Sequence, residues 1–347
     1  MDSFGRKFRV SIFGESHGTA IGVVLDGVQP GLPLTEDDFV EDILRRKSGP
    51  KGTTPRIETD EPEILSGVYN GHTTGAPLAV IFHNRNTRSG DYKLFNDVPR
   101  PGHADYTASV KWLDFNDPRG GGHFSGRLTL PVVAAGVVAK KMCVCSIKAE
   151  LIEVGGVLKI SGSSVSILAA SGGENAAASV IWKDVLDQAI NEGDSVGGIV
   201  ECTVSDVPAG IGEPFFDSVE SMISHAIFSI PGVRGIEFGD GFEAARMKGS
   251  QHNDPFVPAD GEFRTGHPSK NGAGGVNGGI TNGNPLVFRV AFKPTSSIGK
   301  AQKTLNFTTG QMTELEIPGR HDVCFALRTP PVVEAMTAVV LADLMAL

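Results

Sequence analysis

The stretch GVYNGHTTGAPLAV at residues 67–80 aligns without gaps on GVNGGITNGNPLVF at residues 275–288. Seven of the fourteen positions are identical. A weaker similarity links residues 22–33 to residues 198–214, because in both an apolar strand is followed by a valine, a proline and a glycine-bearing turn. The alternative explanation for the similarity is that both segments are glycine-rich turns followed by a strand, a common local arrangement. The gap-free alignment instead favours common descent of the two segments.

The repeat predicts the organisation of the chain. Two copies about 200 residues apart indicate two pseudo-symmetric halves rather than a solenoid. We expect a single domain over residues 1–347, with halves roughly at 1–150 and 190–347. Each half should contain strands, glycine-rich turns and helices.

Local periodicity adds the first elements. Residues 8–13 alternate as a strand does and residues 21–28 form a second apolar run, so the chain should open with a hairpin. Thr35 is an N-cap hydroxyl three residues ahead of Asp38, which predicts a helix that ends in the basic run 45–50. Mixed elements of this kind indicate an α+β protein.

Two apolar runs are predicted to be buried helices. Residues 128–141 have Pro131 near the first turn, where proline is tolerated. The run 330–347 is short and carries Glu334 and Asp343, so a buried helix is a better interpretation than a membrane span.

Composition excludes several classes of function. The formal charge of −9 argues against a general nucleic-acid binder, since affinity for phosphate backbones depends on a basic surface. The four cysteines form no C-x-x-C pair, which argues against zinc or any other metal site and against a disulfide framework. Free thiols and an N-terminus without the apolar core of a signal peptide indicate a cytoplasmic protein.

A candidate anion site lies in the middle of the chain. The segments 100–106 and 117–127 contain three arginines, two histidines and three consecutive glycines just before the predicted helix 128–141. Glycine turns and helix N-termini present backbone N–H groups to an anion, and arginine forks bind carboxylates and phosphates. Histidine has the ordinary pKa nearest to neutrality, so acid–base chemistry is expected there too.

Other candidate groups have simpler alternative explanations. His17, after the first strand, could be a turn histidine, and Arg45 with Arg46 could serve only to complement the helix dipole. The strand-end segment 293–298 supplies a lysine and three hydroxyls that could grip a phosphate. The segment 319–322 (GRHD) sets a cation, a base and a carboxylate side by side, although such a pair is often only a surface ion pair.

Taken together, these segments resemble the chorismate synthase family over essentially the full chain. The matching blocks are FGESHG (13–18), EILSG (63–67), RPGHADY (100–106), RGGG (119–122), GDGF (239–242), GSQ (249–251), AGG (273–275), KPTSSI (293–298) and GRHD (319–322).

The resemblance implies a reaction and an architecture. The reaction is the anti 1,4-elimination of phosphate from 5-enolpyruvylshikimate 3-phosphate, the last step of the shikimate pathway. It needs reduced FMN without net redox change, and therefore an external flavin reductase or reductant. The implied fold has helices sandwiched between antiparallel β-sheets, and the implied assembly is a homotetramer.

The resemblance also implies roles for the residues singled out above. His17 would be the general acid near the leaving phosphate, His103 would stabilise or protonate the reduced flavin, and Asp322 would help the flavin N5 accept the C6 hydrogen. The phosphate and two carboxylates would be bound by Arg45, Arg46, Arg100, Arg127 and Arg320. FMN would be held by Ser125, Gly278, Lys293, Thr295, Ser296, Ser297 and Arg320.

The chain departs from the family pattern in two places. The family commonly has RSSAR after the three glycines, where this chain has HFSGR at 123–127. Lys47 stands where an arginine is usual, and it keeps the charge but not the bidentate fork. Two other functions are kept open, a flavin oxidoreductase and a non-catalytic binder of phosphorylated metabolites.

Overall fold

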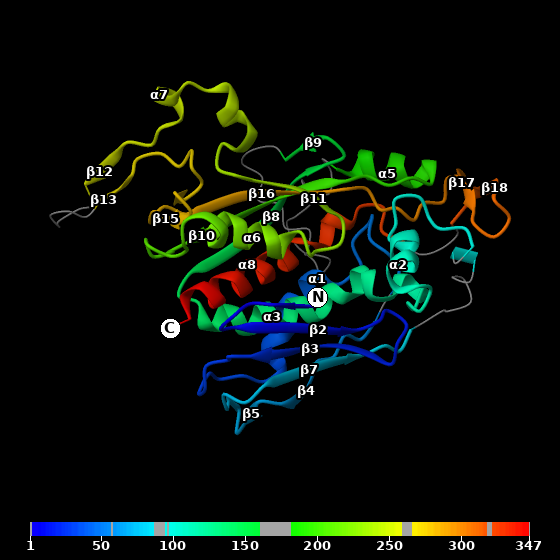
Figure 1. Cartoon of the computed structure of the whole chain (residues 1–347), viewed down its shortest axis with the longest axis horizontal. Helices are drawn as coiled ribbons and strands as arrows, with labels where there is room; N and C mark the ends of the chain where they lie inside the picture. The colour runs from blue at the N-terminus through cyan, green and yellow to red at the C-terminus, as the bar shows by residue number, and fades with distance from the viewer. Residues whose placement is uncertain are drawn as a thin grey trace.

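The computed structural model describes residues 2–56, 58–86, 94–95, 97–159, 182–258, 266–317 and 321–346. Two five-stranded antiparallel sheets form the outer layers, and helices lie between them (Figure 1). The predicted α+β sandwich of two similar halves is confirmed.

The first sheet is built from the N-terminal part of the chain. Its strands, in spatial order, are β1 (Ser3–Phe4), β2 (Arg9–Gly14), β3 (Ala20–Asp26), β7 (Leu78–His83) and β4 (Glu63–Ser66). The predicted opening hairpin is β2–β3, paired from Arg9 opposite Asp26 to Gly14 opposite Ile21. Alternation along β7 buries Leu78, Val80 and Phe82 and leaves the opposite face more open.

The second sheet has the same plan. Its spatial order is β9 (Val157–Leu158), β8 (Ser146–Val154), β10 (Gly198–Ser205), β16 (Leu286–Phe292) and β11 (Val233–Phe238). β3 pairs with β7 in the first sheet as β10 pairs with β16 in the second. β8 crosses the expected boundary near residue 150 but pairs in the second sheet, and the limits of the two halves stay a prediction.

Four helices fill the space between the sheets. They are α1 (Val40–Arg46), α3 (Thr129–Met142), α6 (Val219–Ile227) and α8 (Pro330–Met345). A 3₁₀ turn at Glu36–Phe39 leads into α1, and Thr35 and Asp38 cap it reciprocally as predicted. α3 and α8 are apolar on nearly all sides because both sheets and other helices surround them.

The remaining elements lie outside this sandwich. The helices are α2 (Asp105–Trp112), α5 (Lys183–Glu192) and α7 (Gly249–His252). The two-stranded hairpins are β5 (Val68–Tyr69) with β6 (His72–Thr73), β12 (Phe256–Pro258) with β13 (Gly266–Pro268), β14 (Val276–Asn277) with β15 (Ile280–Thr281), and β17 (Gln302–Asn306) with β18 (Gln311–Leu315).

The aligned repeat forms equivalent structures in the two halves. Thr73, at the end of one hairpin, accepts a hydrogen bond from the N–H of Leu32 at 2.9 Å and donates to the carbonyl of Gln29 at 2.6 Å. Thr281 makes the same pair of bonds with the N–H of Ile211 at 2.9 Å and the carbonyl of Pro208 at 2.6 Å. The two segments of the weaker similarity are therefore the partners of the two hairpins.

A third repeated segment emerges at the starts of α3 and α8. TLPVV at residues 129–133 and TPPVV at residues 329–333 begin the two long helices. The Thr129 hydroxyl donates to the carbonyl of Gly126 at 2.7 Å, and the Thr329 hydroxyl donates to the carbonyl of Ala326 at 3.0 Å. The sequence analysis missed this repeat, which relates the two helices themselves.

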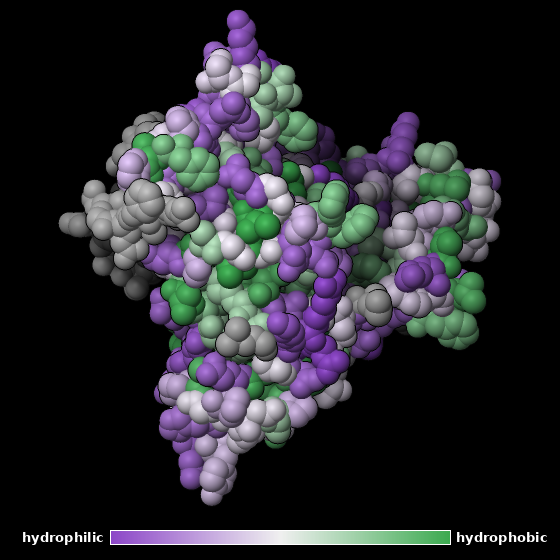
Figure 2. All heavy atoms as spheres, turned by 60° about the vertical axis from the view of Figure 1, so that its left-hand side comes forward, coloured by the Kyte–Doolittle hydropathy of each residue, from purple (hydrophilic) through white to green (hydrophobic). Residues whose placement is uncertain are grey.

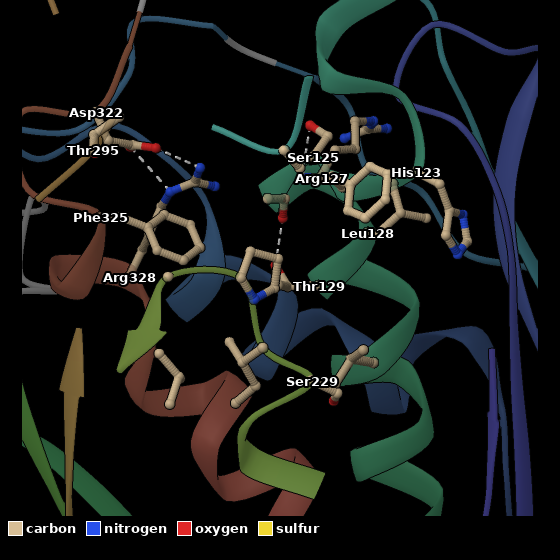
Figure 3. A pocket seen from close by; sticks show the side chains of 18 of the residues that line it. His123, Ser125, Arg127, Leu128, Thr129, Ser229, Thr295, Asp322, Phe325 and Arg328 are labelled. Carbon is tan, nitrogen blue, oxygen red and sulfur yellow. Dashed lines mark hydrogen bonds and ion pairs between the residues drawn. The ribbon is translucent and has the colours of Figure 1, made fainter. Parts of the chain in front are cut away.

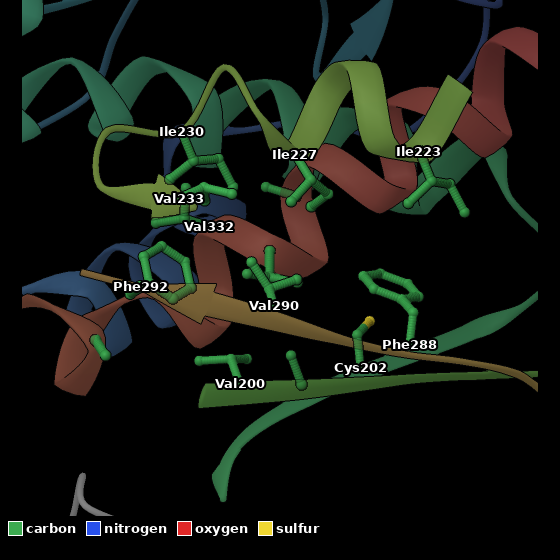
Figure 4. Close-up of a cluster of buried hydrophobic side chains, with 14 of the residues drawn as sticks. Val200, Cys202, Ile223, Ile227, Ile230, Val233, Phe288, Val290, Phe292 and Val332 are labelled. Carbon is green, nitrogen blue, oxygen red and sulfur yellow. The ribbon is translucent and has the colours of Figure 1, made fainter. Parts of the chain in front are cut away.

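The larger core cluster joins the second sheet to α6 and α8. Phe288, Val290 and Phe292 of β16 point toward Ile223 and Ile227 of α6 (Figure 4). A second cluster joins the first sheet to α1, α3 and α8. Within the described ranges, no helix is both long and apolar enough to cross a membrane. The C-terminal run forms the buried helix α8, as predicted.

The crossing of α3 and α8 is tight enough to test. A methyl group at Gly136 would lie 2.2 Å from Cβ and 2.4 Å from Cα of Ala335. Gly136→Ala should gain about 1 kcal/mol in helix propensity. It should nevertheless lower the free energy of unfolding by roughly 2–3 kcal/mol because the helices must separate. Urea unfolding followed by circular dichroism measures this.

Gly249→Ala is the matched control for this substitution. Gly249 lies in α7, and a methyl group there meets no atom within 4 Å. Equal stability of the two variants would show that the crossing tolerates the added carbon.

Candidate active site

A cavity of about 750 Å³ opens where α3 and α8 begin and α1 ends. Among the described residues that line it, eight carry positive charge and four carry carboxylates. The cations are Arg46, Lys47, Arg56, Arg100, Arg127, Arg234, Lys293 and Arg328. The carboxylates are Asp2, Glu58, Asp60 and Asp322. In a chain of net charge −9, this local excess of cations favours a polyanionic ligand.

Arg46 and Arg127 meet at the N-terminal end of α3. Arg46 is fully buried, and its Nε donates to the Thr129 hydroxyl at 2.9 Å. Arg127 Nη1 donates to Asp60 at 2.7 Å, whereas its buried Nη2 has no hydrogen-bond partner. Burial and the nearby Arg328 lower the pKa of Arg46 to about 9, which leaves it charged at neutral pH. An unpartnered guanidinium nitrogen in a cavity is a vacant donor for an anion.

The three glycines form a turn that separates two histidines. Gly120, Gly121 and Gly122 all have positive φ (63°, 83° and 55°). A methyl group on Gly120 would lie 2.5 Å from His17 Cδ2, and one on Gly121 would lie 3.5 Å from His103 Nε2. His17 itself is not one of the described cavity-lining residues and lies directly behind Gly120. Burial, and then the charge of Arg56, lower the pKa of His17.

His103 belongs to a charged triad with Arg100 and Asp105. His103 Nδ1 is 2.6 Å from Asp105 Oδ1, and Arg100 Nη2 donates to the same carboxylate oxygen at 2.7 Å. Because a carboxylate only accepts, Nδ1 carries the proton and Nε2 of the neutral ring keeps its lone pair. Burial lowers the pKa of His103 against the opposing effect of Asp105. The hydrogen bonds from Arg100 and His103 outweigh burial and keep the pKa of Asp105 far below its usual range.

The strand-end segment 293–297 lies beside this triad. Ser297 Oγ accepts from Arg100 Nη1 at 3.1 Å, and Lys293 Nζ donates to Ser296 Oγ at 2.7 Å. The buried Thr295 hydroxyl has no hydrogen-bond partner. Burial, and then Arg234, lower the pKa of Lys293. The segment therefore offers a cation and hydroxyls to one ligand.

Asp322 is held by a residue that the sequence analysis did not single out. Arg328 donates to Asp322 through Nη2 at 2.7 Å and Nε at 3.1 Å (Figure 3). The backbone N–H of Thr54 adds a third bond at 2.9 Å. Arg328 also lies over the ring of Phe325, 5.0 Å from its centroid. The Asp322 carboxylate is therefore fixed in the cavity by three hydrogen bonds.

Sequence reasoning gave His321 no individual role and overlooked Arg56 and Arg328, and all three line the cavity. Burial and the nearby Arg100 lower the pKa of His321 to about 4, and its buried Nε2 has no partner. His321 was visible only as the middle of the GRHD block. Arg56 directly follows Pro55, and Arg328 lies two positions before Pro330. Neither segment carries a motif that indicates a site.

The structure does not bring every predicted site residue to the cavity. Arg45 points away from it and binds Glu334 at 2.6 Å and Asp42 at 2.7 Å, so its expected contact with substrate does not fit this geometry. Gly278 lies in the turn between β14 and β15 and is not among the described residues that line the cavity. Arg320 lies outside the described residues.

His123 and Phe124 occupy the departure from the expected motif. His123 lines the cavity, with Nδ1 2.7 Å from the carbonyl of Gly14 and Nε2 3.1 Å from Asp2. Phe124 packs against Trp112, with ring centroids 5.4 Å apart. Both residues line the cavity, and His123 links this part of its wall to the N-terminal segment.

Comparison with known proteins identifies the family. The model of the family described as chorismate synthase matches residues 8–346. The chain belongs to the chorismate synthase family. A chorismate synthase from Chitinophaga pinensis is 56% identical, over 100% of this chain and 97% of that protein. One from Korarchaeum cryptofilum is 44% identical, over 99% and 96%.

A solved structure agrees with this assignment. A crystal structure of chorismate synthase superposes with a TM-score of 0.73 at 27% identity, covering 98% of this chain and 92% of that one. The activity of the chain is therefore that of a chorismate synthase, a lyase. These relatives lend no support to the alternative functions of oxidoreductase or non-catalytic binder.

The glycine turn can be tested by adding one carbon. In Gly120→Ala the methyl group would push His17 and Ser16 aside, and a displacement of about 1 Å in the wall of an active site costs on the order of a hundredfold in rate. We expect chorismate synthase turnover to fall at least that far while the circular dichroism spectrum is kept. Gly71→Ala is the control, since φ is also positive there but no atom lies within 4 Å. Equal activity of the two variants would contradict the contact.

Substitution of Arg45 should mainly lower stability, whereas substitution of Arg46 should mainly raise the KM for substrate. Arg45→Met leaves the buried Glu334 with Lys140 as its remaining cationic partner. Because Lys140 still neutralises Glu334, the loss should be that of a charge-assisted hydrogen bond, about 1.5–3 kcal/mol of stability, and the KM for substrate should stay within about twofold. Arg46→Met should instead raise KM. Urea unfolding and steady-state kinetics on both variants measure the difference, and a raised KM in Arg45→Met would return Arg45 to the site.

Proposed function

We propose that the chain eliminates phosphate from 5-enolpyruvylshikimate 3-phosphate to form chorismate in this cavity, with reduced FMN bound beside the substrate. The observation that carries the proposal is a set of three buried, unpartnered polar atoms in one cavity with an excess of cations. They are Arg127 Nη2, Thr295 Oγ1 and His321 Nε2. Unsatisfied buried polar atoms are costly, so a ligand is expected to complete them.

The substrate would be bound by arginines fixed before it arrives. Arg46, Arg100 and Arg127 are each held by protein acceptors, which reduces the entropy lost on binding. A phosphate and two carboxylates carry nearly four negative charges, and in a pocket without water each needs a fixed donor. Arg127 Nη2 would supply a bond that no protein group uses.

The flavin would be held by the strand-end segment and the start of α3. Ser125, Lys293 and Thr295 to Ser297 all line the cavity and present a cation and hydroxyls suited to a phosphate and a polar ring edge. When bound, reduced FMN would supply electron density to the substrate and accept the C6 hydrogen.

Protons would be handled by His17, His103 and Asp322. A phosphate dianion next to His17 would raise its pKa and charge it, and its lowered intrinsic pKa favours release of that proton as phosphate leaves. Neutral His103 would present the lone pair of Nε2 as a hydrogen-bond acceptor, its ring fixed by Asp105. Asp322, fixed by Arg328, would provide a hydrogen-bond acceptor in the same cavity.

The proposal extends to partners and compartment. We expect a homotetramer in the cytoplasm, supplied with reduced flavin by an external reductase. Large aromatic side chains such as Phe115, Phe215 and Phe216 are exposed in the single chain, which supports burial in an assembly. Figure 2 shows apolar residues gathered on the projecting lobe at the right of the face it displays.

The deciding experiment is anaerobic. Purified protein is mixed with chemically reduced FMN and 5-enolpyruvylshikimate 3-phosphate, and released phosphate is followed together with the flavin spectrum. We expect many equivalents of phosphate per flavin, with the flavin still reduced at the end. Phosphate release matched by flavin oxidation would indicate net electron transfer, and tight binding without release would indicate a binder; either result contradicts the proposal.

A further inference from the structure

Arg56 has no role in the function proposed above, yet it lines the cavity next to the general acid. It lies between α1 and β4, with its side chain 20% exposed. Among the neighbouring charged groups, Arg56 has the largest effect on the pKa of His17, and it lowers that pKa. A guanidinium at this place needs an explanation because its positive charge disfavours protonation of His17, and His17 must be protonated to act as a general acid.

Glu58 fixes the orientation of Arg56. Nε and Nη2 of Arg56 donate to the same oxygen, Glu58 Oε1, at 3.1 and 2.6 Å. Glu58 is 5% exposed and accepts further bonds from the backbone N–H groups of Arg85 and Asn86 at 3.2–3.3 Å. The Nε and Nη2 side of the Arg56 guanidinium is therefore held by an anchored carboxylate. Nη1 is not bound to Glu58.

The other edge of Arg56 points to the segment that carries His17. Arg56 Nη1 lies 3.4 Å from Oγ of Ser16, which is fully buried. The same hydroxyl and the imidazole of His17 lie against Gly120, a residue of the cavity wall. Ser16 thus orients the second edge of Arg56 at the wall that covers His17, and a guanidinium fixed in the cavity is suited to bind a phosphate group.

We propose that Arg56, oriented by Glu58 and Ser16, is a further substrate-binding residue that holds the phosphate group that leaves. The inference rests on the proposed function and adds one ligand to it. As the C–O bond breaks, charge moves onto the phosphate oxygens, and a fixed guanidinium beside His17 stabilises that charge while His17 transfers its proton. An incoming dianion also offsets the repulsion between Arg56 and the protonated imidazole.

The test uses Arg56→Gln and Arg56→Lys in the full-length protein with reduced FMN under anaerobic conditions. Losing a charge-assisted bond to phosphate should raise the KM for 5-enolpyruvylshikimate 3-phosphate roughly ten- to a hundredfold in Arg56→Gln. Inhibition by added inorganic phosphate should weaken by a similar factor. Arg56→Lys should recover part of both, because it keeps the charge but not the fork.

Arg85→Gln is the matched control. Arg85 carries the same charge on a nearby segment, but its side chain is 62% exposed and its partner is Glu61 at 3.7 Å. The Arg85→Gln variant should keep the KM for substrate and the inhibition by phosphate within twofold of the parent. FMN affinity, measured by flavin fluorescence, should be unchanged in all three variants.

The pH profile separates a local effect from a disturbed fold. The charged groups that face His17 are Arg56 and Glu58 on one side and Arg119 and Asp117 on the other. Arg56 lowers the pKa of His17, so its removal lets the acid keep its proton to higher pH. The alkaline limb of kcat/KM should therefore move to higher pH in Arg56→Gln and not in Arg85→Gln.

Two results would overturn the inference. One is a KM and a phosphate inhibition in Arg56→Gln within twofold of an active parent. The other is a raised KM accompanied by weaker FMN binding and an unmoved alkaline limb, which is the result of a general distortion. If the parent itself released no phosphate, the proposed function would fail. Calorimetric titration with inorganic phosphate would still decide whether Arg56→Gln binds this anion more weakly than the parent.

Discussion

The contact of Gly136 with Ala335, where α3 crosses α8, is the constraint on which the rest of the structure depends. A glycine there lets two apolar helices approach more closely than any side chain would allow. Both helices begin at the same end of the molecule, so their close approach brings Arg127 and Arg328 to one cavity. The sheets pack around this pair, and their apolar faces supply the two core clusters.

Buried charges beside the crossing of α3 and α8 fix the position of α1 against these two helices. Glu334 of α8 accepts from Arg45 of α1 at 2.6 Å, from Lys140 of α3 at 2.8 Å and from the N–H of Ala149 at 2.9 Å. One carboxylate thus links three helices and a strand. Arg46, the next residue along α1, points about 100° away and enters the cavity. The structural and the ligand-binding arginine are neighbours in sequence because a helix turns between them.

Much of this architecture follows from local patterns. Alternation at residues 8–13, the cap at Thr35 and the gap-free repeat were sufficient to predict the hairpin, α1 and the two similar halves. The assignment of Arg45 to substrate stays a prediction, and the structure gives this residue a different partner, because nothing near residue 45 indicates that Glu334, 289 positions away, will bind it. Arg56 and Arg328 were missed in the same way. A cation becomes part of a site through partners that folding brings from distant segments.

The matching starts of α3 and α8 have a consequence for the origin of the fold. The hydroxyls of Thr129 and Thr329 each donate to the carbonyl three residues earlier, but the arginine that enters the cavity is Arg127 in one half and Arg328 in the other, displaced by one position. The cavity lies between the halves, so neither half alone could enclose a substrate. A half-length ancestor would have had to pair with a second copy of itself before the two genes fused. Fusion then freed each copy to diverge, and both halves now contribute cations and apolar side chains to the same cavity.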